Sequence, residues 1–149
     1  MLLRAFEPLK ERAFLVLIGD GPDRAALEKM APDALFTGML SGDGLLAWYN
    51  LIDIMVLPST QEAYGAVTGE ALMAGAKVAV SRRAGSSDLV REGETGFVFD
   101  PSDEAGLTAG LAALLDTVPI GRPIQLRENL LPYRFSTCIQ ALMDEINTL

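Results

Sequence analysis

The sequence has no histidine, and its 149 residues include a single cysteine, Cys138. Without histidine, no imidazole is available as an acid, a base or a metal ligand. A single cysteine cannot form a disulfide within the chain, which favours a reducing, cytoplasmic environment. No cluster of other metal-ligating residue types stands out along the sequence, so we expect neither a metal site nor a bound cofactor.

Basic residues are also scarce. The 12 Lys and Arg residues are outnumbered by 20 Asp and Glu residues, which leaves a net charge of −8. This balance argues against a nucleic-acid partner, because binding to a phosphate backbone needs a basic surface. It is compatible with a small phosphorylated ligand, which backbone amides can hold. The apolar runs are too short to span a membrane, and residues 1–12 lack the apolar core of a signal peptide.

Half of the residues are hydrophobic, as in a folded globular protein. The length favours one domain over residues 1–149, with a C-terminal helical tail at 123–149. Short apolar runs alternate with amphipathic segments, which predicts an α/β fold with a Rossmann-like parallel sheet flanked by helices on both faces. The predicted strands are 14–18, 34–37, 53–57, 78–80 and 97–99, and the predicted helices are 2–12, 22–30, 45–50, 66–74, 103–116 and 135–147, with a helical turn at 87–92.

Four turns directly follow predicted strands, at residues 19–22, 38–41, 58–65 and 81–87. In a parallel sheet the carboxyl ends of the strands share one edge, and ligands bind outside that edge. We therefore expect these turns to line one site.

The most informative segment is residues 53–75, DIMVLPSTQEAYGAVTGEALMAG. It predicts a strand, a turn and then a helix that starts after Gly65 and is capped at its other end by Gly75. A helix N-terminus offers unpaired N–H groups, and a glycine there lets a phosphate approach the amides closely. An ordinary strand-to-helix turn with a sterically required glycine explains the same residues. The segment alone does not decide between these interpretations.

Two acidic residues, Glu62 and Glu70, lie eight positions apart around this turn. If both face one cleft, their carboxylates can accept hydrogen bonds from the neighbouring hydroxyls of a sugar-bearing ligand. The other interpretation is that both are solvated acids near a helix start, where negative charge is favourable. Spacing alone favours this second interpretation.

Residues 62–70, E-A-Y-G-A-V-T-G-E, resemble the E-x-F-G-x-x-x-x-E signature of the donor-binding domain of retaining GT-B glycosyltransferases, the "glycosyl transferases group 1" type. Tyr64 stands where this signature usually has Phe. Further landmarks of that domain occur in the same order along the chain: I-G-D-G-P at 18–22, F-T-G at 36–38, Asp53 with P-S at 58–59, E-A-L-M-A-G at 70–75 and G-E-T-G-F at 93–97.

This resemblance implies that the chain is the C-terminal half of a GT-B fold. It also implies an enzyme that transfers a hexose from a UDP-, GDP- or ADP-linked donor to a hydroxyl acceptor without a metal. It implies that Glu62 contacts the donor sugar as the candidate catalytic residue and that Glu70 binds the ribose hydroxyls. The other implied donor-binding positions lie in the turns that follow three strands: Gly19, Gly21, Gly38, Met39, Leu40, Tyr64, Gly65, Ala66 and Val67. The resemblance assigns the distal phosphate to the amides of 65–67, the base to the backbone of 38–40, and the diphosphate and ribose to the open strand end at 19–21.

The sequence departs from the family pattern in places. Lys77 replaces a usual Pro, and residues 83–88 replace a G-G-x-x-E loop, so the donor sugar stays open. Arg82 and Arg83 are either diphosphate ligands or exposed loop charges, and we expect the latter.

The family's G-R-x…K-G segment and its N-terminal acceptor domain are not found in this sequence. We therefore expect half of a cleft, weak nucleotide binding and no transferase activity from this chain alone. Apolar residues of the predicted 135–147 helix could support a homodimer. The leading alternative is a nucleotide-binding or partner-docking module without catalysis. A nucleotide-sugar epimerase would lack its usual histidine, and a flavodoxin-like domain explains the alternation but not the ordered landmarks.

Overall fold

The computed structural model describes residues 1–118. The predicted tail at 123–149, its helix at 135–147 and Cys138 lie outside the described residues. In chain order the elements are α1 (Leu2–Phe6), η1 (Glu7–Leu9), β1 (Val16–Ile18), α2 (Arg24–Met30), β2 (Leu35–Gly38), α3 (Gly42–Leu51), β3 (Ile54–Leu57), α4 (Val67–Ala74), β4 (Lys77–Ser81), η2 (Gly85–Leu89), β5 (Gly96–Phe99) and α5 (Glu104–Thr117).

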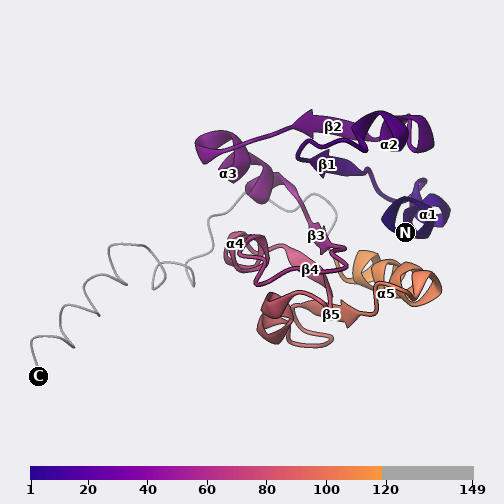
Figure 1. Cartoon of the computed structure of the whole chain (residues 1–149). Helices are drawn as coiled ribbons and strands as arrows, with labels where there is room; N and C mark the ends of the chain where they lie inside the picture. The colour runs from indigo at the N-terminus through magenta and orange to yellow at the C-terminus, as the bar shows by residue number, and fades with distance from the viewer. Residues whose placement is uncertain (119–149) are drawn as a thin grey trace, which may run out of the picture.

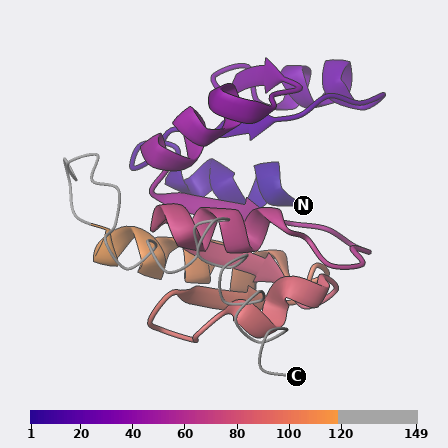
Figure 2. The ribbon, with the colours of Figure 1, turned by 90° about the vertical axis from the view of Figure 1, so that its left-hand side faces the viewer.

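All five predicted strands are present, and the α/β fold with parallel strands flanked by helices is confirmed. The main difference lies in the pairing, because the strands form two sheets. β1 pairs with β2, and β4 lies between β3 and β5 (Figure 1). Among the described strands, neither β1 nor β2 pairs with a strand of the three-stranded sheet, so the ladder is interrupted between β1 and β3. In both ribbon views, β1, β2 and α2 lie together at one end, away from the three-stranded sheet (Figure 2).

The helices differ from prediction mainly at their ends. The predicted 2–12 helix ends with the 3-10 turn η1 at Leu9, and the turn predicted at 87–92 is η2, which starts earlier. Pro22 does not open α2, whose N-cap is Asp23. Gly75 caps α4 as predicted: its φ of +83° is left-handed, and its amide bonds to carbonyls in the last turn of the helix.

The three-stranded sheet is covered on both faces, which follows from the alternation of side chains along β4. Val78 and Val80 belong to a buried cluster with residues of α3 and α4. Ala79, which points to the opposite face, belongs to a second cluster with residues of α1 and α5. This buried sheet fixes the carboxyl ends of β3 and β4, where the turns at 58–66 and 82–86 begin.

Candidate functional site

The turn after β3 is fastened to the turn after β4 by three backbone hydrogen bonds. The amide of Glu62 donates to the carbonyl of Arg83 at 3.2 Å, and the amide of Gly85 donates to the carbonyl of Glu62 at 3.3 Å. The amide of Ser86 donates to the carbonyl of Tyr64 at 2.7 Å. These bonds hold Glu62 at the carboxyl ends of two neighbouring strands, where the sequence predicts a site.

The side chain of Glu62 takes part in its own turn. Its Oε1 accepts a hydrogen bond from the amide of Tyr64 at 3.3 Å, and the residue is half-buried. Tyr64 is an exposed residue, with 55% of its surface accessible to solvent. The turn therefore presents an anchored carboxylate beside an exposed aromatic ring.

Gly65 is required at its position by the backbone and by packing. Its φ is +88°, in the left-handed region that side chains rarely adopt. A Cβ built there would lie 2.7 Å from Leu57 Cδ2 and 2.9 Å from Ser86 Oγ. The steric interpretation of this glycine is thus correct in itself, so its presence alone does not indicate a phosphate.

The start of α4 carries a separate indication of an anion site. In the part of the chain that the structure describes, no acceptor is hydrogen-bonded to the amides of Gly65, Ala66 or Val67. The carbonyls of the first two residues already accept from Thr68 and Glu70 inside the helix. Three N–H groups and the positive end of the helix dipole therefore remain available to an anion.

A buried pair of hydroxyls joins the first turn of α4 to the turn after β4. Thr68 Oγ1 and Ser86 Oγ lie 2.8 Å apart, and both residues are fully buried. Sequence reasoning missed this pair, because a Thr in a helix and a Ser in a loop carry no local sign that they meet. The pair helps to fix the helix start against the loop that faces it.

Replacing Thr68 with valine, which keeps the shape of the side chain, is expected to leave the Ser86 hydroxyl buried without its partner. The expected cost is about 1–3 kcal/mol in the free energy of unfolding, measured by urea denaturation. Adding Ser86→Ala should recover part of this loss, because both polar groups are then removed. A Thr68→Val variant as stable as the parent would contradict this account of the pair.

Glu70 is held by a residue that sequence reasoning did not select. Tyr49, in α3, donates its phenol proton to Glu70 Oε2 at 2.7 Å. Tyr49 is only 5% exposed and packs among buried alanines and valines of α4 and β4. The amphipathic pattern of the 45–50 helix predicts a core aromatic residue, but it cannot show which acceptor the hydroxyl meets.

Burial first, and then the hydrogen bond to the Glu70 carboxylate, raises the pKa of the Tyr49 phenol above its usual value. An alkaline absorbance titration of the chain minus that of Tyr49→Phe is expected to show a phenol that ionises above pH ~10. The unfolded chain loses this proton first, so stability should be complete below pH ~10 and fall above it. A difference curve with its midpoint at or below ~10 would contradict the assignment.

The other predicted contacts lie at the ends of β1 and β2. Gly19 and Gly38 are brought together there, with the amide of Gly19 donating to the carbonyl of Gly38 at 2.9 Å. The amide of Gly21 bonds to the carboxylate of the residue before it. Met39 is 76% exposed, and Leu40 is half-buried. No hydrogen bond among the described residues joins this group to the turn that holds Glu62.

Arg82 and Arg83 are both exposed in the loop after β4, and a role as diphosphate ligands stays untested. Arg82 takes part in an ion pair. Its guanidinium pairs with the carboxylate of Asp100 at 3.4 Å. The hydroxyl and amide of Ser102 and then this guanidinium lower the pKa of the Asp100 carboxyl.

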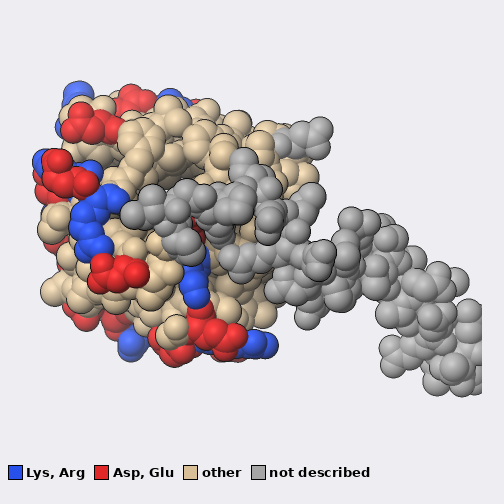
Figure 3. All heavy atoms as spheres, turned by 180° about the vertical axis from the view of Figure 1, so that it is seen from behind, with Lys and Arg blue, Asp and Glu red and all other residues tan. Residues whose placement is uncertain are grey.

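Other charged side chains lie mainly along the left and the bottom of the face opposite Figure 1 (Figure 3). Separate ion pairs join Arg4 to Glu104 at 2.7 Å and Arg12 to Asp116 at 2.6 Å.

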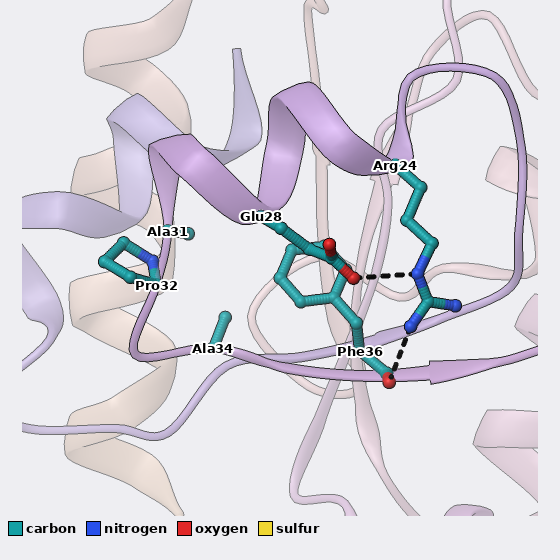
Figure 4. Close-up of a pocket in the computed structure, with 6 residues that line it drawn as sticks. All are labelled: Arg24, Glu28, Ala31, Pro32, Ala34 and Phe36. Atoms are coloured by element: carbon teal, nitrogen blue, oxygen red, sulfur yellow. Dashed lines mark hydrogen bonds and ion pairs between the residues drawn. The ribbon is translucent and has the colours of Figure 1, made fainter.

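A shallow pocket of about 390 Å³ lies between α2 and β2 (Figure 4). Arg24 bonds there to Glu28 at 2.8 Å and to the carbonyl of Phe36 at 3.3 Å. The lining residues are Arg24, Glu28, Ala31, Pro32, Ala34 and Phe36, and none of them is a predicted site residue. Within residues 1–118 there is no group of three metal-ligating side chains, and no helix is long and apolar enough to cross a membrane.

Comparison with known proteins identifies the family. Residues 1–117 match the family described as glycosyl transferases group 1. Sulfoquinovosyl transferase SQD2 of Arabidopsis thaliana is 38% identical over 119 residues, which cover 76% of this chain and 23% of the relative. A GDP-mannose-dependent alpha-mannosyltransferase of Corynebacterium glutamicum is 38% identical over 89 residues, which cover 60% of this chain and 22% of the relative. The chain thus spans about a quarter of the length of these relatives.

Solved structures agree on the fold. Anabaena HepE in complex with UDP-glucose has a TM-score of 0.72 at 20% identity, covering 99% of this chain and 44% of HepE. Sucrose-phosphate synthase from Thermosynechococcus elongatus has a TM-score of 0.68 at 24% identity, covering 77% of this chain and 32% of the synthase. Both likenesses rest on the GT-B fold rather than on close sequence identity. The match over residues 1–117 shows that the chain belongs to the group 1 family of glycosyl transferases.

Proposed function

We propose that this chain carries the donor half-site of a retaining glycosyltransferase that moves a hexose from a nucleoside diphosphate sugar to a hydroxyl acceptor. The observation that carries the proposal is the open N-terminus of α4, which follows Glu62 in the chain and carries Glu70 in its first turn. Membership of the family supports it. So do structural neighbours whose complexes hold UDP or UDP-glucose.

In this proposal the distal phosphate accepts hydrogen bonds from the amides of residues 65–67. Glu70 accepts hydrogen bonds from the ribose hydroxyls, and Glu62 faces the donor sugar beside Tyr64. The backbone of 38–40 meets the base, and the left-handed glycine at position 19 keeps the strand end open, with Gly21, for the ribose and diphosphate. The scheme needs no metal, since the N–H groups and the helix dipole face the phosphate charge.

The proposed transfer takes place on one face of the sugar. The bond between the anomeric carbon and the diphosphate oxygen breaks, and the acceptor hydroxyl oxygen bonds to that carbon from the same side. The hydroxyl proton passes to the departing diphosphate oxygen. Negative charge grows on the diphosphate during this step, so N–H donors already aimed at it lower the barrier. Glu62 acts at the reacting face, where its anchored carboxylate can stabilise the positive charge that develops on the sugar.

The described residues form only the donor wall of such a cleft, and the chain spans about a quarter of its relatives. We therefore expect no transfer from UDP-glucose, GDP-mannose or ADP-glucose to a hydroxyl acceptor by this chain alone. Measurable turnover would contradict this part of the proposal.

Isothermal titration with UDP, GDP and ADP tests donor binding directly. At least one diphosphate should bind, weakly, and the matching nucleoside should bind far less because it lacks the phosphates. Glu104→Gln, at the start of α5 where Glu104 pairs with Arg4, is the matched control and should bind like the parent. Absence of binding for all three diphosphates would overturn the proposal and favour a partner-docking role.

A further inference from the structure

Tyr49 contacts Glu70 of the proposed site but has no role in the donor-binding scheme described above. It lies in α3, and its ring is buried against α4 and β4. Its hydroxyl reaches Glu70, which is exposed on the fourth position of α4. One end of this hydrogen bond is therefore fixed in the core, and the other end is a carboxylate on the surface of the proposed ribose site.

The hydrogen bond from Tyr49 orders the Glu70 side chain before a ligand binds. An exposed glutamate side chain ordinarily samples several rotamers, and ordering it costs conformational entropy. Here the phenol oxygen lies 2.7 Å from Oε2, a normal length for an O–H···O bond to a carboxylate. A tyrosine has a single O–H donor, so it occupies one lone pair of one oxygen. The carboxylate is thus ordered before a ligand arrives, and its other oxygen keeps its full capacity to accept.

We propose that Tyr49 is a positioning residue that holds the Glu70 carboxylate ready for the two neighbouring hydroxyls of a ribose. This inference rests on the proposed function. It explains why the site would prefer a nucleotide with ribose hydroxyls to one without them. A preorganised acceptor loses less entropy on binding, so it raises the affinity for ligands that present hydroxyls to it. The affinity for a ligand without these hydroxyls should not depend on Tyr49.

The simpler account is that Tyr49 is a core residue whose hydroxyl happens to be satisfied. That account predicts that Tyr49→Phe changes stability and leaves the ratio of affinities between two ligands unchanged. The two accounts therefore differ in ligand selectivity, which loss of stability alone does not alter.

The test measures the affinity of the chain for the best-binding nucleoside diphosphate and for its 2′,3′-dideoxy counterpart. In the parent chain the ribose form should bind more tightly. Tyr49→Phe is expected to weaken binding of the ribose form by about 3–10-fold, the cost of ordering one side chain on binding, and to leave the dideoxy form unchanged. In a Glu70→Ala background, which removes the acceptor, the same substitution should have a much smaller effect, as expected for two residues that act through one contact.

Leu111→Val, in the cluster on the opposite face of the sheet, is the control for lost stability. It should lower the melting temperature without changing the ratio of the two affinities. A parent chain that binds neither form overturns the proposed function and this inference with it. A parent chain that prefers ribose, with a Tyr49→Phe variant that keeps the same preference or loses affinity equally for both ligands, overturns this inference alone.

Discussion

Replacing Gly65 with alanine is expected to lower the free energy of unfolding by about 2–4 kcal/mol and to abolish measurable binding of nucleoside diphosphates. The backbone of Gly65 is left-handed, with φ at +88°. The new Cβ would also be too close to Leu57 Cδ2, at 2.7 Å, and to Ser86 Oγ, at 2.9 Å. Relief of these contacts must move the start of α4, where the proposed phosphate contacts lie.

Gly69→Ala provides the matched control, one turn further along the same helix. A Cβ there would lie 3.7 Å from Leu89 Cδ1, an ordinary van der Waals contact. Since alanine favours a helix over glycine by roughly 1 kcal/mol, this variant should be as stable as the parent or more stable. Urea denaturation and isothermal titration of both variants measure the contrast. A Gly65→Ala chain with the stability and affinity of the parent would show that this turn is not constrained as described.

Glu70→Gln is expected to weaken nucleoside diphosphate binding by about 10–100-fold, because hydrogen bonds to an ionised acceptor contribute more than those to a neutral one. The amide has the same shape as the carboxylate, and its oxygen can still accept from Tyr49. We therefore expect the fold and its melting temperature to change little. The loss should fall on ligands with ribose hydroxyls and spare the dideoxy form.

Glu104→Gln is the control for removal of one negative charge. Glu104 begins α5 and pairs with Arg4, away from the turns that form the proposed site. Titration calorimetry of the two variants with the same diphosphate separates a local effect from a general change of charge. Equal affinity of Glu70→Gln and the parent would remove Glu70 from the proposed ribose contact.

The strands could be predicted from the sequence, but their pairing could not. Continuous apolar runs such as 54–57 indicate buried strands, because side chains on both faces of such a strand are covered. The pattern within a run does not specify the neighbouring strand. The interruption between β1 and β3 is a property of the whole arrangement, and no local feature of either strand indicates it.

The proposed site shows the same division between local and distant information. The left-handed cap at Gly75 follows from its place at the end of one helix, and the sequence predicts it correctly. The need for glycine at position 65 depends on Leu57 and Ser86, which come from the strand before it and the loop after β4. The bond from Tyr49 to Glu70 likewise joins separate helices. The pattern of apolar residues within one helix does not predict such contacts between elements.

Amide chemical-shift mapping during titration with UDP-glucose, GDP-mannose and ADP-glucose tests the donor half-site most directly. With at least one of these ligands, the largest shifts should fall on the amides of residues 65–67 and on neighbours of Glu62 and Glu70. The amides of α5, which packs on the opposite face of the three-stranded sheet, should respond little. No shift with any of the three ligands, or shifts confined to α5, would contradict the assignment of the donor site to the start of α4.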